Sequence, residues 1–389
     1  MIRRMWFRWA CVWAMLCCVG CEPQSGVDTA SLNNRNTANS PVGGTAVLPI
    51  SELDRQLNDR LDRVLEFTLN HRLLDVNEHG AWQILHGVLA YQQDFPVQTP
   101  NGLQPAVDYV LNGGNMQGWT MEPGDVLDSA TGRRGLRAIM EPGTKIGQGH
   151  SDQWLAILAQ CHLPTNQIIR VGSAEYTMES FVQQVQMDVW QNRDREWSWT
   201  LIGLSLYLPK DASWVATDRQ TWSIEKLVES EVQQDLDASA CGGTHRLIGL
   251  AMALNRHVAQ GGEVTGPWAD AQQLIRDAVE RTRQYQNPDG SFSTNYFARP
   301  SNSPDVKNRL GATGHILEFL SVALPQEELE SEWVKRAAWR LCQLFDDTRD
   351  LALECGALYH AAHGLVLYRE RVYGQRSYRT AHQHSATVR

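Results

Sequence analysis

The chain has 389 residues, of which 42% are hydrophobic and 20% are charged; this composition is globular rather than disordered. Its formal net charge of −9 argues against a general nucleic-acid-binding protein, whose surface would be basic. The length is compatible with one large domain or two average ones. Four of the eight cysteines fall within the first 21 residues, so the chain divides into a short N-terminal segment and a large acidic body.

The N-terminal segment has the pattern of a secretory signal. Three arginines precede an apolar run that is too short for a membrane-spanning helix of about 20 residues. Cys18-Val-Gly-Cys21 resembles a bacterial lipobox, which implies that residues 1–20 are removed and that Cys21 carries a lipid. The alternatives are an ordinary signal peptide and an uncleaved anchor. We therefore expect an exported protein, anchored by its lipid in the membrane of the cell envelope and facing the periplasm.

Composition also sets the limits of the folded body. Residues 21–48 are rich in Ser, Asn, Thr, Gly and Pro and show no apolar periodicity, which is typical of a disordered tether. Residues 374–389 are polar and basic and are expected to form a disordered tail. Residues 49–373 are then predicted to form one domain.

Six apolar segments within this domain share one pattern, with Leu or Val at the sixth position and small residues beside it. Each segment is apolar nearly all round, which predicts a helix that is buried on every side. The segments are Gln83–Tyr91, His150–Leu158, Trp199–Tyr207, His245–Ala253, His315–Ala323 and His360–Tyr368.

An amphipathic helix is predicted before each apolar segment, with Thr177 and Ser223 as candidate N-caps of two of them. Six amphipathic helices alternating with six buried ones predict an all-α fold, an (α/α)6 toroid of about twelve helices with long loops on one face. The rival is an open α-solenoid of stacked helix pairs. Closure is favoured because the first and last apolar segments resemble each other. The predicted amphipathic helices are Ser51–Asn70, Leu103–Asn112, Tyr176–Trp190, Ser223–Leu236, Pro267–Gln286 and Pro325–Phe345.

One segment resembles a known family. Gln286-Asn-Pro-Asp289-Gly290-Ser-Phe292 is similar to the repeat of squalene cyclases and protein prenyltransferase β-subunits. The resemblance implies a member of the α/α-toroid superfamily, in which this segment ends an outer helix and ties it to the next turn. It implies no cyclase or transferase activity. Together with the N-terminal segment, it makes the chain similar to bacterial lipoproteins with the same twelve-helix plan.

The two longest predicted loops, Gly113–Gly149 and Asn287–Gly311, both enter the N-terminal end of an apolar helix. Long loops in a compact domain are frequently functional, and converging helix N-termini favour an anionic group. We therefore expect the mouth of a pocket on this face.

Four histidines occupy the first position of an apolar segment: His150, His245, His315 and His360. Equivalent positions in a closed arrangement would bring them together, as acid–base groups or as metal ligands. The alternative is that each histidine caps or packs against the start of its own helix.

Acidic and aromatic residues accompany these histidines. Asp152 and Glu196 are candidate catalytic carboxylates, and the alternative for each is a solvated or capping acid. Trp154, Trp197 and Trp199 are candidate substrate-binding residues, because an aromatic face beside a carboxylate suits a sugar ring and its acid–base cleavage.

Two cysteines raise the prospect of a metal. Cys241 and Cys355 each lie just before a first-position histidine, and with His315 they would suit zinc with one open position. The helices concerned would be roughly 15 Å apart if neighbours are about 9 Å apart, so the two thiols would have to approach through their loops. The same obstacle faces a disulfide between them. Cys161 and Cys342 are predicted to be core residues.

Together these patterns predict an exported enzyme that acts on a glycan or similar polymer by acid–base chemistry. The alternatives are a non-catalytic lipoprotein that binds a ligand or a protein, and a zinc-dependent enzyme. The chain lacks the P-loop, the dinucleotide-binding glycine motif, the Gly-x-Ser-x-Gly elbow and His-Glu-x-x-His. No cofactor other than zinc is indicated, no nucleic acid is expected as a partner, and the oligomeric state is left open.

Overall fold

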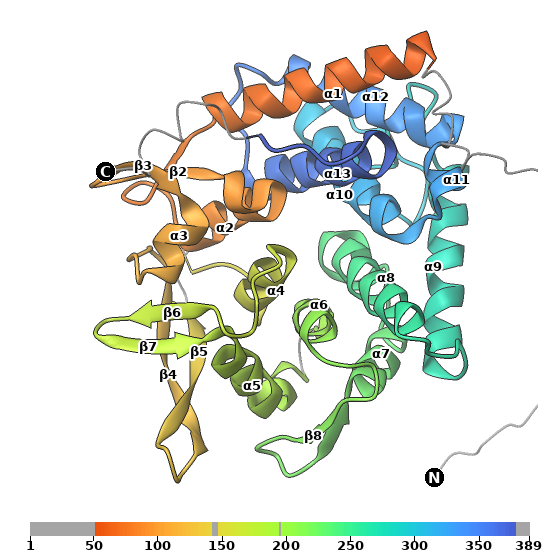
Figure 1. Ribbon diagram of the computed structural model, residues 1–389. Coiled ribbons are helices and arrows are strands. Elements are labelled where there is room, and N and C mark those ends of the chain that lie inside the picture. The colour runs from red at the N-terminus through yellow and green to blue at the C-terminus, as the bar shows by residue number, and fades with distance from the viewer. Residues whose placement is uncertain (1–50, 142–146, 194–195, 379–389) are drawn as a thin grey trace, which may run out of the picture. The chain divides into compact units, whose positions relative to one another are not determined.

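The computed structural model describes residues 51–141, 147–193 and 196–378, which are mostly α-helical (Figure 1). The predicted signal peptide, the predicted lipidation site Cys21 and the predicted tether lie outside the described residues. None of the described helices is both long enough and apolar enough to span a membrane.

Six apolar helices correspond to the six repeated segments and are buried along most of their length, although the second of them begins at Gln153 and leaves His150 in the loop before it. Each packs against the next one in chain order, and the last packs against the first. Leu, Ile and Ala side chains fill these contacts, which explains why the segments carry almost no polar face. The helices are α2 (Ala81–Tyr91), α4 (Gln153–Gln160), α6 (Ser198–Tyr207), α8 (Thr244–Ala259), α10 (Val306–Ala323) and α13 (Cys355–Tyr373).

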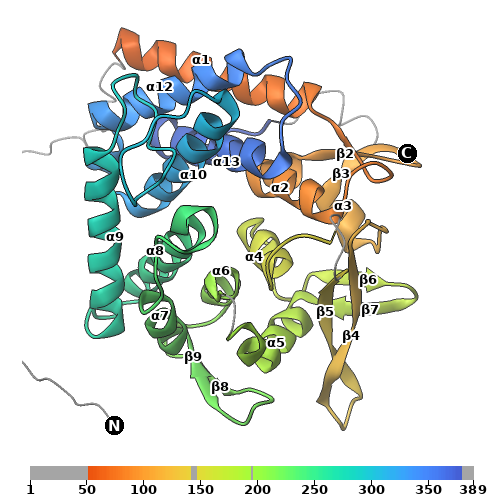
Figure 2. The same cartoon turned by 180° about the vertical axis from the view of Figure 1, so that it is seen from behind.

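The amphipathic helices pack on the apolar ones with their buried stripe. Figures 1 and 2 both place α1, α9 and α12 at the periphery and α4, α6 and α8 nearer the middle. Thus α1 contacts α12 and α13, α9 contacts α7 and α8, and α12 contacts α10. The helices are α1 (Glu52–His71), α3 (Ala106–Leu111), α5 (Met178–Asp188), α7 (Ile224–Val232), α9 (Pro267–Gln284), α11 (Gln326–Leu329) and α12 (Glu332–Asp347).

Both predicted N-caps are confirmed. The hydroxyl of Thr177 accepts a hydrogen bond from the backbone N–H of Ser180, and that of Ser223 accepts one from Lys226, each at 3.1 Å. These bonds satisfy donors that have no partner within the helix. The helix predicted over Pro325–Phe345 is divided by a turn into α11 and α12.

The prediction of an all-α fold is too strict, because the described residues also form four small β-sheets. The segment Gly113–Gly149, predicted to be a loop, contains a hairpin of two of the longest strands. Residues 103–105, predicted to begin a helix, belong to a strand instead. The hairpin in residues 113–149 was not predicted, because bulges and Gly and Pro residues interrupt the alternation of its strands. The strands are β1 (Leu74–Asp75), β2 (Pro96–Thr99), β3 (Gly102–Pro105), β4 (Trp119–Asp128), β5 (Arg133–Met140), β6 (Ile168–Val171), β7 (Ala174–Thr177), β8 (Ser213–Val215) and β9 (Thr221–Ser223).

Helices α10 and α13 approach each other closely because glycines lie at their contact. A Cβ added to Gly314 would lie 2.4 Å from Cα of Ala361, and one added to Gly364 would lie 2.9 Å from the carbonyl oxygen of Gly314. Neither methyl group would fit without moving backbone. This close contact brings Glu318 of α10 within hydrogen-bond distance of two histidines of α13.

The buried cysteines agree with the sequence, whereas the C-terminal segment is more ordered at its start than predicted. Cys161 and Cys342 are buried, as predicted, and all four described cysteines are free. Beyond α13, the side chain of Tyr378 is buried and its ring lies edge-on to Tyr91 at 5.6 Å. The chain therefore remains packed on the domain as far as residue 378.

Candidate functional site

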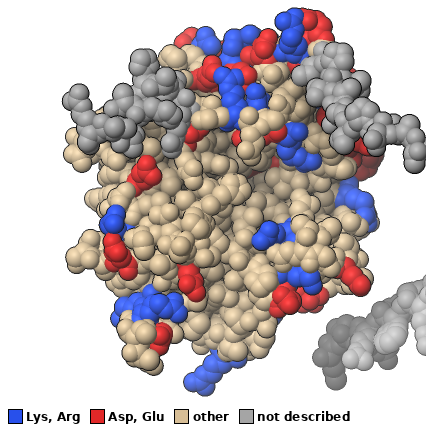
Figure 3. Space-filling model, viewed as in Figure 1, with Lys and Arg blue, Asp and Glu red and all other residues tan. Residues whose placement is uncertain are grey.

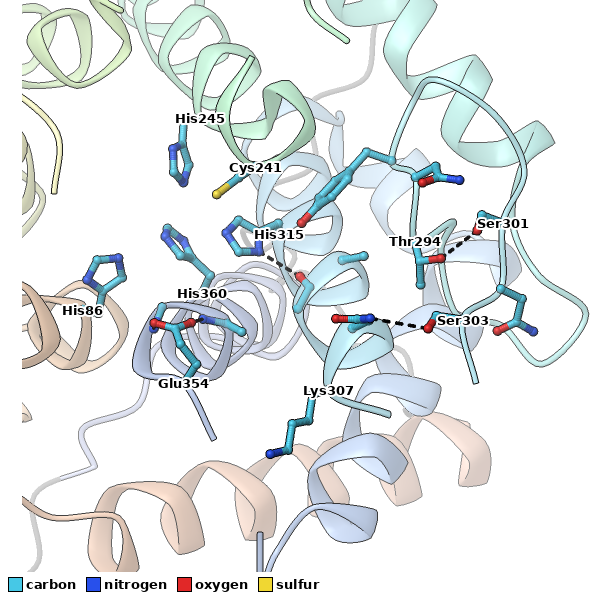
Figure 4. A pocket seen from close by; sticks show the side chains of 18 of the residues that line it. His86, Cys241, His245, Thr294, Ser301, Ser303, Lys307, His315, Glu354 and His360 are labelled. Atoms are coloured by element: carbon cyan, nitrogen blue, oxygen red, sulfur yellow. Dashed lines mark hydrogen bonds between the residues drawn. The ribbon is translucent and has the colours of Figure 1, made fainter. Parts of the chain in front are cut away.

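A cavity of about 840 Å³ opens at the N-terminal ends of the apolar helices α2, α8, α10 and α13. Figure 4 shows imidazoles from several helices converging on it. The histidines that line it are His86, His150, His245, His315 and His360.

The structure brings the four first-position histidines together around His245. Its ring centroid lies 5.0 Å from that of His150, 5.1 Å from that of His360 and 5.7 Å from that of His315. The rings of His315 and His360 are stacked at 4.2 Å. His86 joins the cluster with its ring edge-on to His360 at 5.0 Å. The cluster therefore contains five imidazoles.

Glu318 holds one side of the cluster. Its two carboxylate oxygens accept hydrogen bonds from Nδ1 of His360 and Nδ1 of His363, each at 2.7 Å. Burial alone would raise the pKa of Glu318, but the two imidazoles outweigh burial and hold the pKa well below its ordinary value. Glu318 is therefore an anion that fixes Nδ1 of His360 as a donor. Nε2 is the nitrogen that remains for the cavity.

His150 forms a second pair with a carboxylate. Its Nδ1 lies 2.5 Å from Oε1 of Glu196, and the two side chains are 24% and 13% exposed. His150 lines the large cavity, and together with Glu196 it also lines a neighbouring cavity of about 480 Å³. The pair thus stands where two cavities meet. We regard it as the more accessible of the two carboxylate–imidazole pairs.

His245 differs from the other histidines because both of its ring nitrogens are buried without a hydrogen-bond partner. Burial and then the neighbouring imidazoles hold its pKa well below the ordinary value, so the ring is neutral. The next residue, Arg246, is paired with buried Glu231 at 2.8 Å, which anchors this end of α8.

Cys241 lies beside His245 and His315, on the short turn before α8. The nearest ligand atoms of the three residues all lie within 4.8 Å of one another. Burial raises the pKa of the Cys241 thiol to about 12. Burial likewise lowers the pKa of His315 to about 3. In the absence of a metal all three groups are thus neutral at pH 7, and binding a metal ion would release the thiol proton and leave a thiolate ligand.

The structure does not bring Cys355 to this group. Its Sγ accepts a hydrogen bond from Nε2 of Gln83 at 3.6 Å. A second group of potential metal ligands among the described residues consists of His150, Glu196 and His245. Of the predicted metal ligands, Cys241 and His315 come together, with His245 in the place that Cys355 was expected to take.

Asp152 faces away from the large cavity. Its carboxylate accepts hydrogen bonds from Thr200 at 2.6 Å and from Asn192 at 2.8 Å, beside a separate cavity of about 130 Å³. Burial raises the pKa of Asp152 to about 6. No cation pairs with this carboxylate among its described contacts, which is why burial dominates.

The three predicted substrate-binding tryptophans are buried and do not line the large cavity. Trp154 stacks on Trp119, and the indole of Trp197 donates to the carbonyl of Val189. The ring of Trp199 lies 5.1 Å from that of His245 and so supports the cluster from behind. These side chains pack the site rather than face a ligand.

Sequence reasoning missed His86, Trp82, Glu318 and His363. Trp82 lines the cavity and lies against His86 at 4.2 Å. The similarity of His86-Gly87 to His363-Gly364 was visible in the sequence and could have singled out both histidines. A glutamate inside an otherwise apolar segment was the available signal for Glu318.

The segment before α10 gives the cavity a polar wall. Thr294 and Ser301 are hydrogen-bonded to each other at 2.9 Å, and Asn287 holds the segment through bonds to Phe292 and Ser301. Figure 4 shows Lys307 near the same wall. The polar side chains of this wall are Thr294, Asn295, Ser301, Asn302 and Ser303, together with Lys307 and Asn308 from the first turn of α10.

The face of the molecule seen in Figure 3 shows no large field of one sign. In the view of Figure 3, Lys and Arg are interspersed with Asp and Glu near the edge formed by α1 and α12, and much of the middle is without charged side chains.

Comparison with known proteins adds no further constraint on the function: neither a family model nor a curated protein matches this chain.

Proposed function

We propose that the six apolar helices close into an (α/α)6 toroid and that the amphipathic helices surround them. The contacts of each apolar helix with the next, and of α13 with α2, support this arrangement. So does Gln286, whose side chain donates to the carbonyls of Gly290 and Trp333 and ties the end of α9 to α12. A toroid would explain why residues far apart in sequence meet at one end of the domain.

We further propose that the protein is an enzyme that works by acid–base chemistry in the histidine cavity. The observation that carries this proposal is the presence of two carboxylate–imidazole pairs, His150–Glu196 and His360–Glu318, whose imidazoles both contact His245. A carboxylate on Nδ1 orients an imidazole and leaves Nε2 to give or take a proton. Two such groups can supply the acid and the base that cleavage of one bond requires.

The ligand we propose is a glycan or a similar polyhydroxylated polymer. The amides and hydroxyls of the wall before α10 can exchange hydrogen bonds with sugar hydroxyls. Trp82 and Tyr296 provide the aromatic surface in the cavity that the predicted tryptophans do not. The second cavity beyond His150 leaves room for a chain that continues past the point of cleavage.

In this mechanism His150 and His360 exchange protons with the substrate, and the two glutamates orient them. One imidazolium protonates the leaving oxygen while the other imidazole takes a proton from the attacking water. Correctly placed acid–base groups typically contribute a factor of about 10²–10⁴ to the rate.

The test is turnover of cell-envelope glycans and soluble oligosaccharides by the full-length protein, with products identified by mass spectrometry. We expect the double variant His150→Gln/His360→Gln to lose at least about 100-fold in turnover. His71→Gln, at an exposed position at the end of α1, is the matched control and should keep full activity. Unchanged turnover in the double variant would refute the acid–base assignment, and binding without turnover in the wild type would favour a non-catalytic binding protein.

We also propose that the protein is exported and lipid-anchored through Cys21, which rests on the sequence pattern. Labelling of cells with a radioactive fatty acid should mark the protein, and Cys21→Ser should abolish the label. A labelled Cys21→Ser variant would exclude this residue as the anchor.

A further inference from the structure

Three potential metal ligands meet at the wall of the cavity between α8 and α10. One ligand atom each from Cys241, His245 and His315 lies within 4.8 Å of the other two. Zinc–nitrogen and zinc–sulfur bonds of about 2.1 and 2.3 Å would place tetrahedral ligand atoms roughly 3.5 Å apart. Small side-chain rotations would therefore bring the three atoms to bonding distance of one ion.

Three of the four imidazole nitrogens of this group lack a hydrogen-bond partner although they are buried. His245 is 3% exposed and has no hydrogen bond at Nδ1 or at Nε2, and His315 is 5% exposed and has none at Nε2. Buried polar atoms are nearly always satisfied in folded proteins, and each exception calls for a cause. A metal ion would satisfy one nitrogen on each ring.

The orientation of His315 is the one that a metal ligand requires. Its Nδ1 lies 2.8 Å from the carbonyl oxygen of Gly311 and donates to it. The proton is thereby fixed on Nδ1, and the lone pair of Nε2 points away from the helix. Metal-bound histidines are characteristically held by such a bond from their second nitrogen.

The backbone at Cys241 has a conformation that residues with a side chain rarely adopt. Cys241 has φ 49° and ψ 39°, and Gly242 and Gly243 also have positive φ. A non-glycine residue in this conformation is uncommon and frequently marks a functional site. A Cβ on Gly242 would lie 2.1 Å from the ring of Tyr296, so the turn also requires glycine there.

From these observations we infer that Cys241, His245 and His315 bind one divalent transition-metal ion, with zinc the best fit. One thiolate and two imidazoles form a borderline-soft ligand set, which suits zinc better than calcium or magnesium. Three protein ligands facing a cavity leave a fourth position for water or substrate. The competing group that includes Glu196 is less suited, because Nδ1 of His150 already contacts that carboxylate.

The test is metal binding by the full-length protein after treatment with a chelator. We expect the wild type to take up one zinc ion per chain by elemental analysis. Cobalt in its place should show an absorption band from sulfur-to-metal charge transfer. Cys241→Ser should abolish this band, and both Cys241→Ser and His315→Gln should weaken zinc binding by at least about 100-fold. Cys355→Ser is the matched control and should change neither property.

Several results would overturn the inference. They are a wild-type protein that takes up no stoichiometric zinc, a cobalt complex without the sulfur band, and a Cys241→Ser variant that keeps full zinc affinity. Loss of zinc in Glu196→Gln but not in His315→Gln would assign the ion to the competing group instead. If Cys241→Ser fails to fold, the cobalt spectrum of the wild type and the zinc affinity of His315→Gln decide whether the site exists.

These measurements need no substrate, so they separate the metal site from the proposed enzyme activity. Zinc bound without turnover of any glycan would uphold the site and count against the function. Turnover that survives complete removal of zinc would uphold acid–base catalysis and make the metal dispensable for it.

Discussion

The two carboxylate–imidazole pairs of the cavity are built differently. Glu318 and His360 are 3% and 2% exposed, and each oxygen of Glu318 accepts an aligned hydrogen bond from a histidine. His150 and Glu196 are 24% and 13% exposed, and the contacting Oε1 of Glu196 has no aligned donor. The first pair is part of the core between two tightly packed helices, and the second can rearrange. We conclude that the first pair is held rigidly in the core and that the second is the one that a ligand meets first.

The largest effect on stability is expected from Glu318→Ala. This variant leaves two buried imidazoles without their shared acceptor, and breaking a buried ionic pair in this way costs about 3–5 kcal/mol of unfolding free energy. Glu318→Gln keeps one acceptor oxygen and should cost less, about 1–3 kcal/mol. Urea denaturation at pH 7 measures both values. A loss below about 1 kcal/mol for Glu318→Ala would show that this pair is not structural.

The same variant carries a pH signature. Because the pKa of Glu318 is held well below 4.5, its stabilising effect is present above pH 4.5 and is lost as the pH falls through the folded-state pKa. The stabilities of the wild type and Glu318→Ala should therefore converge in acid. If the difference in unfolding free energy between the wild type and Glu318→Ala stays constant with pH, packing and not the charge of Glu318 causes it.

A buried carboxylate without an imidazole partner offers a second comparison. Raising the pKa of Asp152 from 3.8 to about 6 means that the folded state loses up to about 3 kcal/mol of stability as the pH rises from 4 to above 6. The amide oxygen of Asp152→Asn can still accept from Thr200 and Asn192. We expect this variant to be more stable than the wild type by about 1–3 kcal/mol at pH 8 and similar to it at pH 4. Greater stability at pH 4 instead would reverse the assigned direction of the pKa shift.

These comparisons show which parts of the fold the sequence predicts well. All six apolar helices were predicted because each carries the same local pattern of apolar and small residues. Thr177 and Ser223 were recognisable as N-caps because each directly precedes an amphipathic segment. The hairpin of β4 and β5 was missed, because bulges and Gly and Pro residues interrupt its alternation. Local pattern thus identifies helices and caps, whereas irregular strand pairing depends on partners that the pattern does not name.

The candidate site shows the same division. The equivalent positions of His245, His315 and His360 indicated where they would gather, because the repeat carries three-dimensional information. Glu318 was missed because its partners, His360 and His363, lie on α13 and are more than 40 residues away in the sequence. Cys355 was a candidate ligand together with Cys241 because each lies just before a first-position histidine, but its thiol contacts Gln83 instead.

The smallest effect is expected for the accessible pair, and it tests the opening comparison directly. In a double-mutant cycle, His150→Gln and Glu196→Gln should show a coupling free energy of about 1 kcal/mol or less, as is usual for partly exposed ion pairs. The corresponding cycle for His360→Gln and Glu318→Gln should give about 2–3 kcal/mol, because neither group can recover its hydrogen bond from water. Both cycles are measured by urea denaturation at pH 7. Equal coupling energies would show that His150 and Glu196 are held as rigidly as the buried pair, and the division between a rigid pair and an accessible pair would have to be given up.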